Sequence, residues 1–449
     1  MKSLDPKTFQ YRNVLVLGLA KSGKAAAELL LDSGIKVTIN DLKADENSVD
    51  IKKFKERGAR VVTGSHPLEL LNDIDLLVKN PGIPYENPMV AEAEKRQIPI
   101  VTEIELSGFL HDGNLIGVTG SNGKTTTTTL IHEFLKEDEQ PASIAGNIGE
   151  VACEVARSTA DEETMVVELS SFQLLGTETF SPNVAVWLNL FDAHLDYHHT
   201  AANYHKAKAK IAANQSERDY LVYNADDSAI LNFLPSFASQ LVPFSLQGKV
   251  EGAWSDEEWV YFKDEPVVKR RDIVLVGEHN LANILAAVAA VKVSGITNEA
   301  IVKVLTSFGG VEHRLEFVTK KNGVYFYNDS KATNILATSY ALKAFDQPII
   351  LLAGGLDRGN QFDELVEKLG NVKAMVLFGE TAEKISLAGM QAGVQHISTV
   401  NNMKEAVEEA YQISTSEDVI LLSPACASWD QYRTFEERGH MFKEAVHKL

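Results

Sequence analysis

The segment VTGSNGKTTTTTL, residues 118–130, places two glycines, a lysine and a run of five threonines between two apolar stretches. Glycines allow successive backbone N–H groups to converge on an anion, and the start of a helix adds positive potential. Lys124 is placed to reach terminal phosphate oxygens, and the Thr125 hydroxyl is placed to bind magnesium. The strict phosphate-loop spacing is not met, because glycines stand at positions 117 and 120 rather than at 118. We nevertheless predict an ATP-binding loop here.

Charged side chains follow two further apolar stretches. The segment MVVELSS ends its apolar run in Glu168, where a carboxylate ligand for nucleotide-bound magnesium is expected, although a solvated acid at a strand end is an equal alternative. The segment LNLFDAHLDYH carries His194 and Asp196 just beyond the next strand. A lone histidine is usually structural, and a lysine run on a helix is usually a solvated face. The residues alone therefore leave open the roles of His194, Lys206, Lys208 and Lys210.

A second glycine turn, residues 18–23, precedes Asp41 at the end of the next predicted strand. The pattern is similar to a dinucleotide-binding fingerprint, but Ala20 stands where close approach to a pyrophosphate requires glycine. A nicotinamide-dependent oxidoreductase is therefore the alternative enzyme class, and Asp41 could instead accept from a ribose or uracil group. A non-enzymatic nucleotide switch is a third class, but the sequence has no N-K-x-D guanine-reading motif.

Three polar clusters follow apolar strands in the last third of the chain. They are HRLEF at 313–317, YNDSKATN at 327–334, and SPACASWDQYRTFEERGHMF at 423–442. Polar clusters at strand ends can be simple turns. Three of them in one domain, beyond a nucleotide-binding domain, are better explained by a substrate cleft.

These motifs need a scaffold, and the chain supplies apolar runs that alternate with amphipathic segments over nearly its whole length. This pattern is typical of βαβ units and parallel sheets, so we predict an α/β fold throughout. We place an N-terminal domain at 1–108, a central domain at 109–310 and a C-terminal domain at 311–449. Paired glycines in SFGGVEHRLEF, 307–317, mark a hinge into the third domain.

Composition excludes several classes of partner. The chain has 449 residues and a formal net charge of -19, which disfavours nucleic acid and anionic membranes because both require clustered Lys and Arg. The N-terminus lacks a secretory signal, and no apolar run is long enough to span a bilayer. We therefore expect a cytoplasmic protein, acting as a monomer on small molecules. Its two cysteines, Cys153 and Cys426, suggest neither a disulfide framework nor a zinc site.

The motifs together resemble those of the Mur ligases, the ATP-dependent amide-forming enzymes of peptidoglycan precursor synthesis. The resemblance runs through all three domains in GSNGKTTT, ELSSFQL, HNLANILAA, HRLE and NDSKATN. The segments SPACASWDQ and F-x-x-R-G-x-x-F are similar to those of the member that adds D-glutamate. Folylpolyglutamate synthetase lacks such an N-terminal domain, and the D-N-P-R-type motif of the diaminopimelate-adding member is absent. The resemblance implies a Rossmann-like N-terminal domain, a central P-loop ATPase-type domain and a Rossmann-like C-terminal domain.

The resemblance also implies residue roles. Lys124, Glu168, His194 and Lys208 would be catalytic, and Thr125, Glu168, His194 and Lys208 would hold Mg²⁺. ATP would contact Gly120, Ser121, Asn122, Gly123, Lys124, Thr125, Thr126, Asn280, Asn283, Arg314 and Asp329. UDP-N-acetylmuramoyl-L-alanine would contact Leu19, Ala20, Asp41, Asn80, Gly82, Asn147 and His194. D-Glutamate would contact Lys331, Thr333, Arg358, Ser428 and Phe435, where Arg358 replaces the lysine that the family commonly has.

The implied reaction is phosphorylation of the L-alanyl carboxylate by ATP, followed by attack of the D-glutamate amine on the acyl phosphate. In the Mur ligases a lysine in the Y-x-x-x-K segment is carbamylated by carbon dioxide, and the match from Tyr204 points to Lys208. Lys206 and Lys210 lie two residues away on either side, so on a helix we expect them to face away and stay solvated.

Overall fold

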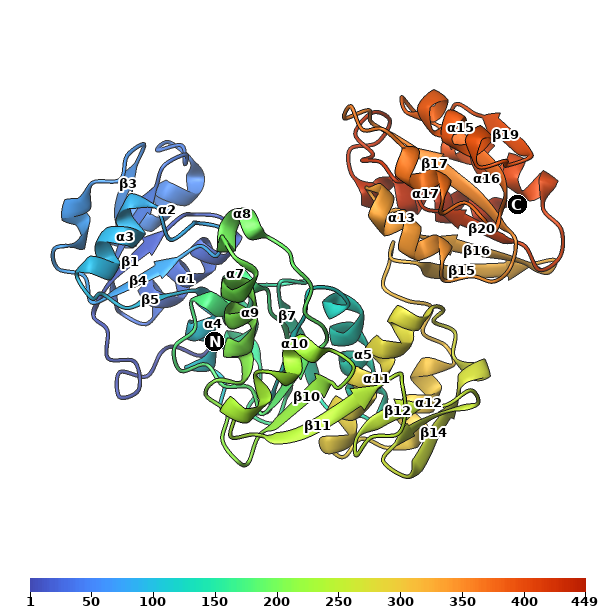
Figure 1. Cartoon of the computed structure of the whole chain (residues 1–449). Helices are drawn as coiled ribbons and strands as arrows, with labels where there is room; N and C mark the ends of the chain where they lie inside the picture. Colours follow the sequence, from blue (N-terminus) through green and yellow to red (C-terminus); the bar gives the residue numbers. More distant parts are fainter. The chain divides into compact units, whose positions relative to one another are not determined.

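The computed structural model describes residues 1–449, which form three β-sheets (Figure 1). The first two sheets belong to one compact unit, residues 1–271 and 282–304. The third sheet belongs to a second unit, residues 272–281 and 305–449. Each sheet contains parallel strands connected through helices, so the predicted α/β class with three sheet domains is confirmed. The boundaries near residues 108 and 310 remain our proposal.

The N-terminal sheet has five parallel strands in the order β3-β2-β1-β4-β5. The turn after β1 passes through Gly18 at φ 91°, and a Cβ on Gly23 would overlap the Gly18 carbonyl, so two glycines let α1 pack directly on the strand end. The elements are β1 (Asn13–Leu17), α1 (Lys21–Asp32), β2 (Lys36–Asp41), α2 (Val49–Glu56), β3 (Arg60–Thr63), η1 (Leu68–Leu71), β4 (Leu76–Lys79), α3 (Pro88–Lys95), β5 (Ile100–Val101) and α4 (Glu103–Gly108).

The central sheet has nine strands in the order β14-β13-β12-β11-β10-β9-β6-β8-β7. Strands β6 to β12 are parallel, whereas β13 and β14 extend the sheet in antiparallel fashion. The elements to β9 are β6 (Leu115–Thr119), α5 (Lys124–Glu137), β7 (Ala142–Gly146), α6 (Ala152–Ser158), β8 (Thr164–Glu168), α7 (Ser171–Leu175) and β9 (Val184–Trp187). The later ones are α8 (Leu195–His198), α9 (Ala201–Ala209), η2 (Lys210–Ala212), β10 (Tyr220–Asn224), α10 (Ser228–Leu231), η3 (Leu234–Ser236), β11 (Gln240–Ser245), β12 (Ala253–Ser255), β13 (Trp259–Phe262), β14 (Glu265–Lys269), η4 (Arg270–Asp272), α11 (Glu278–Val293) and α12 (Asn298–Leu305).

The third sheet has six strands in the order β15-β16-β20-β17-β18-β19, and all but the edge strand β15 are parallel. The elements are β15 (Glu316–Lys321), β16 (Val324–Asn328), α13 (Ile335–Leu342), β17 (Ile349–Gly354), α14 (Asp363–Val366), β18 (Val372–Phe378), α15 (Ala382–Gln391), β19 (His396–Thr399), α16 (Met403–Ile413), β20 (Val419–Leu422) and α17 (Phe435–Lys448).

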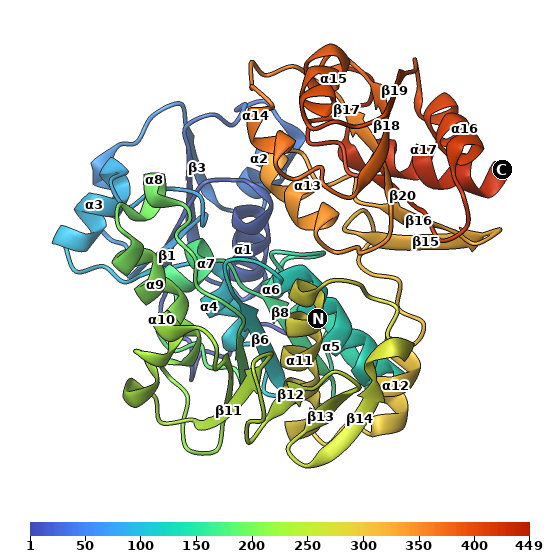
Figure 2. The same cartoon turned by 45° about the vertical axis from the view of Figure 1, so that its right-hand side comes forward.

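Both faces of the third sheet are buried. Leu351 of β17 packs with α13 and α15 residues on one face, while its neighbour Leu352 packs with α16 and α17 residues on the other. The helices lie accordingly on the two sides of the sheet (Figures 1 and 2). Burial on both faces explains why these strands are continuous apolar runs, such as IILLAG, rather than alternating ones.

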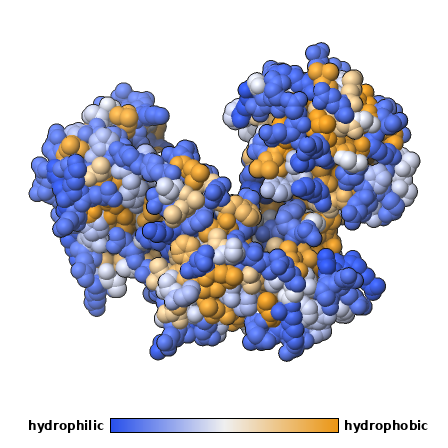
Figure 3. Space-filling model, viewed as in Figure 1, coloured by the Kyte–Doolittle hydropathy of each residue, from blue (hydrophilic) through white to orange (hydrophobic).

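The surface is mainly hydrophilic on the face shown in Figure 3, in keeping with a formal net charge of -19. No helix is both long enough and apolar enough to cross a membrane. The two cysteines are free and buried.

Candidate active site

The loop after β6 is shaped by two glycines. Gly123 caps α5 at φ 83°, and a Cβ there would overlap the side chain of Asn283. A Cβ on Gly120 would come within 2.9 Å of Leu188 Cβ. Neither position therefore has room for a side chain, and the backbone can turn its N–H groups toward an anion.

The same loop is held from outside by side chains that follow β9. The Tyr204 hydroxyl donates to Ser121 Oγ at 2.9 Å, and Ser121 Oγ donates to the Phe191 carbonyl at 3.0 Å. The Asn122 N–H donates to Asn189 Oδ1 at 2.9 Å. Lys124 Nζ lies over the loop, where it donates to the carbonyls of Gly120 and Ser121 at 3.0 and 3.2 Å. Because the first turn of α5 carries no acid, its positive end is uncompensated, and the loop is suited to a phosphate chain.

Glu168 ends β8 next to this loop and is 2% exposed. Its Oε1 accepts a 2.8 Å hydrogen bond from Asn147 Nδ2, while its Oε2 is buried without a hydrogen-bond partner. A buried carboxylate oxygen without a partner is costly unless a ligand satisfies it. Glu168 therefore fits the role of a metal ligand, because Mg²⁺ prefers such oxygens.

Lys208 of α9 is 2% exposed and lies beneath the same loop. Its Nζ donates to the Gly120 carbonyl at 2.8 Å and lies 4.9 Å from the centre of the Tyr204 ring. Burial lowers the pKa of Lys208 well below its ordinary value, and the charge of Lys124 lowers it further, whereas Glu168 opposes the shift. A larger fraction of Lys208 is therefore the neutral amine, which is the form that reacts with carbon dioxide.

The two flanking lysines differ from each other. Lys206 is exposed, as predicted. The prediction for Lys210 was wrong, because its Nζ donates to the Leu175 carbonyl at 2.9 Å and burial lowers its pKa. The reason is that Lys210 begins the 3₁₀ turn η2, which breaks the simple helical spacing on which the prediction relied.

His194 precedes α8 in the left-handed region, at φ 54°. Its ring makes an edge contact with Phe172, with 4.9 Å between centroids. Burial lowers the pKa of His194, and the nearby charge of Lys208 lowers it further. A neutral imidazole can bind a metal or accept a hydrogen bond.

A cavity of about 410 Å³ lies in the first unit, between the turn after β1 and the ends of β4, β7 and β8. Four residues predicted to bind the UDP-substrate line it, namely Ala20, Asn80, Gly82 and Asn147. Leu19 is buried behind the cavity, and its N–H donates to Asp41 Oδ2 at 2.7 Å. Burial of Asp41 acts to raise its pKa, but hydrogen bonds from the backbone N–H groups of Leu19, Lys43 and Ala44 outweigh it and lower the pKa. Asp41 thus fixes two segments, the turn after β1 through Leu19 and the start of the loop after β2 through Lys43 and Ala44.

Three further residues of the cavity lining bear on its chemistry, and none of them was predicted to bind the substrate. Lys21 lines it and donates to the Gly149 carbonyl at 2.8 Å, and Phe172 forms part of its wall. Glu103 also lines it, and burial raises the pKa of this carboxyl to about 7. Two of them stand inside segments that the sequence does single out, since Lys21 falls in the 18–23 turn and Phe172 in ELSSFQL, whereas Glu103 stands in no motif.

In the second unit, the predicted residues gather at the ends of β16, β17 and β20. Asp329 Oδ1 accepts from the Leu315 N–H at 3.1 Å and Oδ2 accepts from Ser423 Oγ at 2.9 Å, while burial raises the pKa of this carboxyl to about 7. Lys331 Nζ lies 5.0 Å from the centre of the Phe435 ring. The buried Ser428 Oγ has no hydrogen-bond partner. The Thr333 N–H donates to the Lys331 carbonyl at 2.9 Å, so these two residues share one turn.

Arg358 is exposed and stacks on the ring of Trp429, with 4.7 Å between the guanidinium carbon and the ring centre. A planar guanidinium can stack in this way, whereas the lysine common in the family would contact the ring only as a point charge. Arg358 therefore contacts Trp429, the residue that directly follows Ser428.

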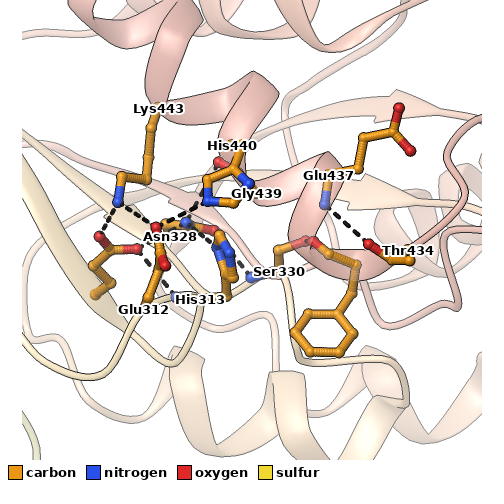
Figure 4. Close-up of polar contacts among 11 residues, drawn as sticks. Glu312, His313, Asn328, Ser330, Thr434, Glu437, Gly439, His440 and Lys443 are labelled. Carbon is orange, nitrogen blue, oxygen red and sulfur yellow. Dashed lines mark hydrogen bonds and ion pairs between the residues drawn. The ribbon is translucent and has the colours of Figure 1, made fainter. Parts of the chain in front are cut away.

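The HRLE segment is held by Asn328 at the end of β16 and by Lys443 of α17 (Figure 4). Asn328 Nδ2 lies 2.8 Å from His313 Nδ1 and donates to Glu316 Oε2 at 2.9 Å. Lys443 Nζ donates to Glu312 Oε1 at 2.9 Å and to Glu316 Oε1 at 2.5 Å. This network fixes the residues on either side of Arg314, and Asn328 directly precedes Asp329.

Asn280, which is also predicted to contact ATP, donates from its side chain to the Val276 carbonyl at 2.8 Å at the start of α11.

The R-G pair of the F-x-x-R-G-x-x-F segment now has a structural reason. Arg438 is fully buried, and its guanidinium donates to the carbonyls of Ser330, Cys426 and Gly354 at 2.9, 3.0 and 3.4 Å. Burial lowers the pKa of Arg438 to about 10. A Cβ on Gly439 would overlap the imidazole of His313, so only glycine fits there. The pair ties the loops after β16, β17 and β20 together.

Gly439→Ala should destabilise the second unit by about 1–3 kcal/mol, because a methyl group would push His313 out of its buried place. Gly370→Ala is the matched control, because a Cβ there would meet nothing within 4 Å, and it should change stability by less than about 0.5 kcal/mol. Calorimetric unfolding of the two variants checks this. Equal unfolding temperatures would contradict the steric explanation.

Family models match three successive segments of the chain. They are the Mur ligase MurD-like N-terminal domain at residues 12–102, the Mur ligase middle domain at 118–291, and the Mur ligase glutamate ligase domain at 313–426. The chain belongs to the Mur ligase family.

Similar Mur ligases include two from bacilli. The UDP-N-acetylmuramoylalanine--D-glutamate ligase of Geobacillus kaustophilus is 57% identical over 444 residues, which covers 98% of each chain. The Bacillus subtilis enzyme of the same name is 55% identical over 443 residues, again with 98% of each chain covered. As a member of this family, the present chain is an ATP-dependent ligase.

Solved Mur ligase structures share the fold. The UDP-N-acetylmuramate-alanine ligase MurC of Thermotoga maritima matches with a TM-score of 0.56 at 19% identity, covering 98% of this chain and 99% of its own. The MurF ligase of Thermotoga maritima, in complex with ADP, matches with a TM-score of 0.56 at 18% identity, covering 99% and 97%. At these identities the likeness concerns the fold alone.

Proposed function

We propose that this Mur ligase joins D-glutamate to the L-alanyl carboxylate of UDP-N-acetylmuramoyl-L-alanine at the expense of ATP, in peptidoglycan precursor synthesis. The observation that carries the proposal is the full-length similarity to D-glutamate ligases, and a loop suited to phosphate supports it. That loop is Gly120–Gly123, with Glu168 and Lys208 buried beside it. ATP dependence follows from the family, while the residue roles below are our proposal.

The phosphate chain of ATP would lie along the loop at the start of α5. Lys124 would turn from the carbonyls of Gly120 and Ser121 toward the terminal phosphate and neutralise charge during its transfer. The N–H groups of the first turn of α5, which includes Thr126, would hold the remaining phosphates. The rest of the nucleotide would contact Asn280, Asn283, Arg314 and Asp329, of which Asn283 already lies against Gly123.

Thr125, Glu168, His194 and modified Lys208 would hold Mg²⁺, which supplies charge neutralisation at the phosphoryl group. The chain must offer mainly oxygen ligands for this ion. Among these ligands, Glu168 Oε2 has the clearest structural support, because it is buried without a hydrogen-bond partner.

We propose that Lys208 becomes a ligand by carbamylation. The lone pair of its neutral amine forms a bond to the carbon of CO₂, one C–O π bond breaks onto oxygen, and the nitrogen loses a proton to solvent. The cation is thereby replaced by a carboxylate-like anion. The lowered pKa of Lys208 supports this step, because an ammonium has no lone pair to donate.

The UDP-substrate would occupy the cavity of about 410 Å³. Leu19, Ala20 and Asp41 would contact the uridine end through the loop that Asp41 fixes, and Asn80, Gly82 and Asn147 would contact the diphosphate and sugar. Lys21 is the one cation among the residues that line the cavity, so we assign it to the diphosphate charge. His194 would meet the alanyl end beside the metal.

The carboxylates of D-glutamate would meet the two cationic side chains of the second unit. Lys331 is placed by Phe435 and Arg358 by Trp429, in each case by contact with a ring face. Ser428 Oγ, buried without a partner, can donate to a carboxylate, and Thr333 adds a hydroxyl on the Lys331 turn. The D-glutamate amine would then attack the acyl phosphate, and inorganic phosphate would leave.

Omission of each substrate in turn tests the proposal. Phosphate release should require ATP, the UDP-substrate and D-glutamate together for sustained turnover. Release that persists without the UDP-substrate would contradict it. The alternative oxidoreductase class predicts an absorbance change with NADH, and that result would replace the ligase assignment.

A further inference from the structure

A buried lysine lies directly behind the substrate cavity. Lys79 ends β4, next to the turn at residues 80–84 that supplies Asn80 and Gly82 to the cavity, and is itself 1% exposed. Its Nζ donates to the carbonyls of Pro81 and Ile83 at 3.2 and 2.9 Å. The ammonium group therefore holds this turn from its inner side, while the outer side of the turn faces the cavity.

The third partner of Lys79 comes from a distant part of the chain. Lys79 Nζ donates to the Tyr197 hydroxyl of α8 at 3.0 Å. That hydroxyl itself lies 3.0 Å from the Pro81 carbonyl and 2.9 Å from the Ile83 carbonyl. The ammonium and the hydroxyl thus converge on the same two carbonyl oxygens, and the turn is fixed from two elements at once.

Tyr197 also contacts a second part of the cavity lining. Its ring makes an edge contact with Phe172, with 4.6 Å between centroids. Phe172 lines the cavity and contacts the ring of His194. A chain of contacts therefore runs from the turn at 80–84 through Lys79, Tyr197 and Phe172 to His194, and it joins two parts of the cavity lining, the turn and Phe172.

Fold stability alone does not account for a charged group at this position. All three hydrogen-bond acceptors of Lys79 are neutral oxygens, and its ammonium also lies 4.9 Å from the centre of the Tyr85 ring. Burial without a carboxylate lowers the pKa of Lys79 to about 8. An apolar side chain of similar length would fill the end of β4 without that desolvation cost. The ammonium forms hydrogen bonds to the turn that no apolar side chain can form, besides its contact with the Tyr85 ring.

We propose that Lys79 and Tyr197 are positioning residues for the UDP-substrate, acting as a brace that sets the 80–84 turn and links it to Phe172 and, through Phe172, to His194. The inference rests on the proposed function, in which that turn contacts the diphosphate and sugar. Neither side chain touches the substrate, so the brace acts through Asn80 and Gly82.

Kinetics of Lys79→Met and Tyr197→Phe test the brace. Each variant should raise KM for UDP-N-acetylmuramoyl-L-alanine about tenfold, because a hydrogen bond from a charged group contributes on that scale. KM for ATP and for D-glutamate should stay within about twofold, as expected for sites that the change does not touch. The double variant should be no worse than the poorer single variant, because both changes remove the same brace.

Lys95→Met, on α3 of the same domain, is the control, because Lys95 is exposed. It should leave all three KM values unchanged. Equal KM values in Lys79→Met and the unmodified protein would overturn the proposal. So would a parallel change in all three KM values, or additive effects in the double variant. If Lys79→Met does not fold, Tyr197→Phe decides alone by the same KM comparison.

Calorimetric titration with UDP separates this inference from the proposed function. If the unmodified protein binds UDP but forms no amide product, the proposed ligase reaction fails. The brace is then judged from the UDP dissociation constant, which should still rise about tenfold in both variants. An unchanged dissociation constant would overturn the brace in that case as well.

Discussion

Lys208→Ala is expected to lower turnover about a hundredfold or more while the protein stays folded. Removal of preorganised charge at a transferring phosphoryl group has effects of this size. The loss should come from the missing carbamate rather than from a missing cation. Lys208 lies beneath the Gly120 carbonyl, 2% exposed, with its pKa lowered well below its ordinary value by burial and by Lys124.

Three measurements check the Lys208 prediction. Circular dichroism of Lys208→Ala should show an intact fold. ¹³C NMR with labelled bicarbonate should show a carbamate signal only in the unmodified protein. Small carboxylates added to the variant should partly restore its turnover. Lys206→Ala is the matched control, because Lys206 is the exposed lysine of the same helix. Full activity of Lys208→Ala, or no carbamate signal from the unmodified protein with magnesium, would refute the assignment.

Glu168→Gln should have the second largest effect, again about a hundredfold or more in turnover. The substitution preserves the shape of the side chain and the contact of Oε1 with Asn147, but it replaces the partnerless Oε2 by an amide group that cannot bind a cation. The magnesium concentration for half-maximal activity should therefore rise, while the affinity for UDP stays unchanged.

A magnesium titration of phosphate release checks the Glu168 prediction. Glu162→Gln, an exposed acid just before β8, serves as the control and should behave as the unmodified protein does. Unchanged magnesium dependence in Glu168→Gln would show that this carboxylate has a purely structural role.

Strand, turn and helix positions around the phosphate loop could be predicted from sequence because each depends on residues close together in the chain. The run from β6 to α5 is one example, and Glu168 at the end of β8 is another. The resemblance to Mur ligases then supplied Lys208, whose burial beneath the loop depends on a contact across 88 positions.

Other parts of the site depend on contacts that no local pattern encodes. Lys79 pairs with Tyr197 across 118 positions, and a lysine at a strand end gives no sign that it will be buried. Gly439 makes room for His313 only because α17 packs on the HRLE segment. Lys210 was placed in solvent because helical spacing was extended past Ala209, where α9 ends.

Mass spectrometry of a single reaction tests the central claim most directly. The protein is incubated with ATP, D-glutamate and UDP-N-acetylmuramoyl-L-alanine that carries ¹⁸O in its alanyl carboxylate. The account predicts a product heavier by one glutamyl residue and inorganic phosphate that carries one ¹⁸O atom, because the carboxylate oxygen passes to phosphate through the acyl phosphate. Absence of the glutamyl product, or its formation with unlabelled phosphate, would contradict the account.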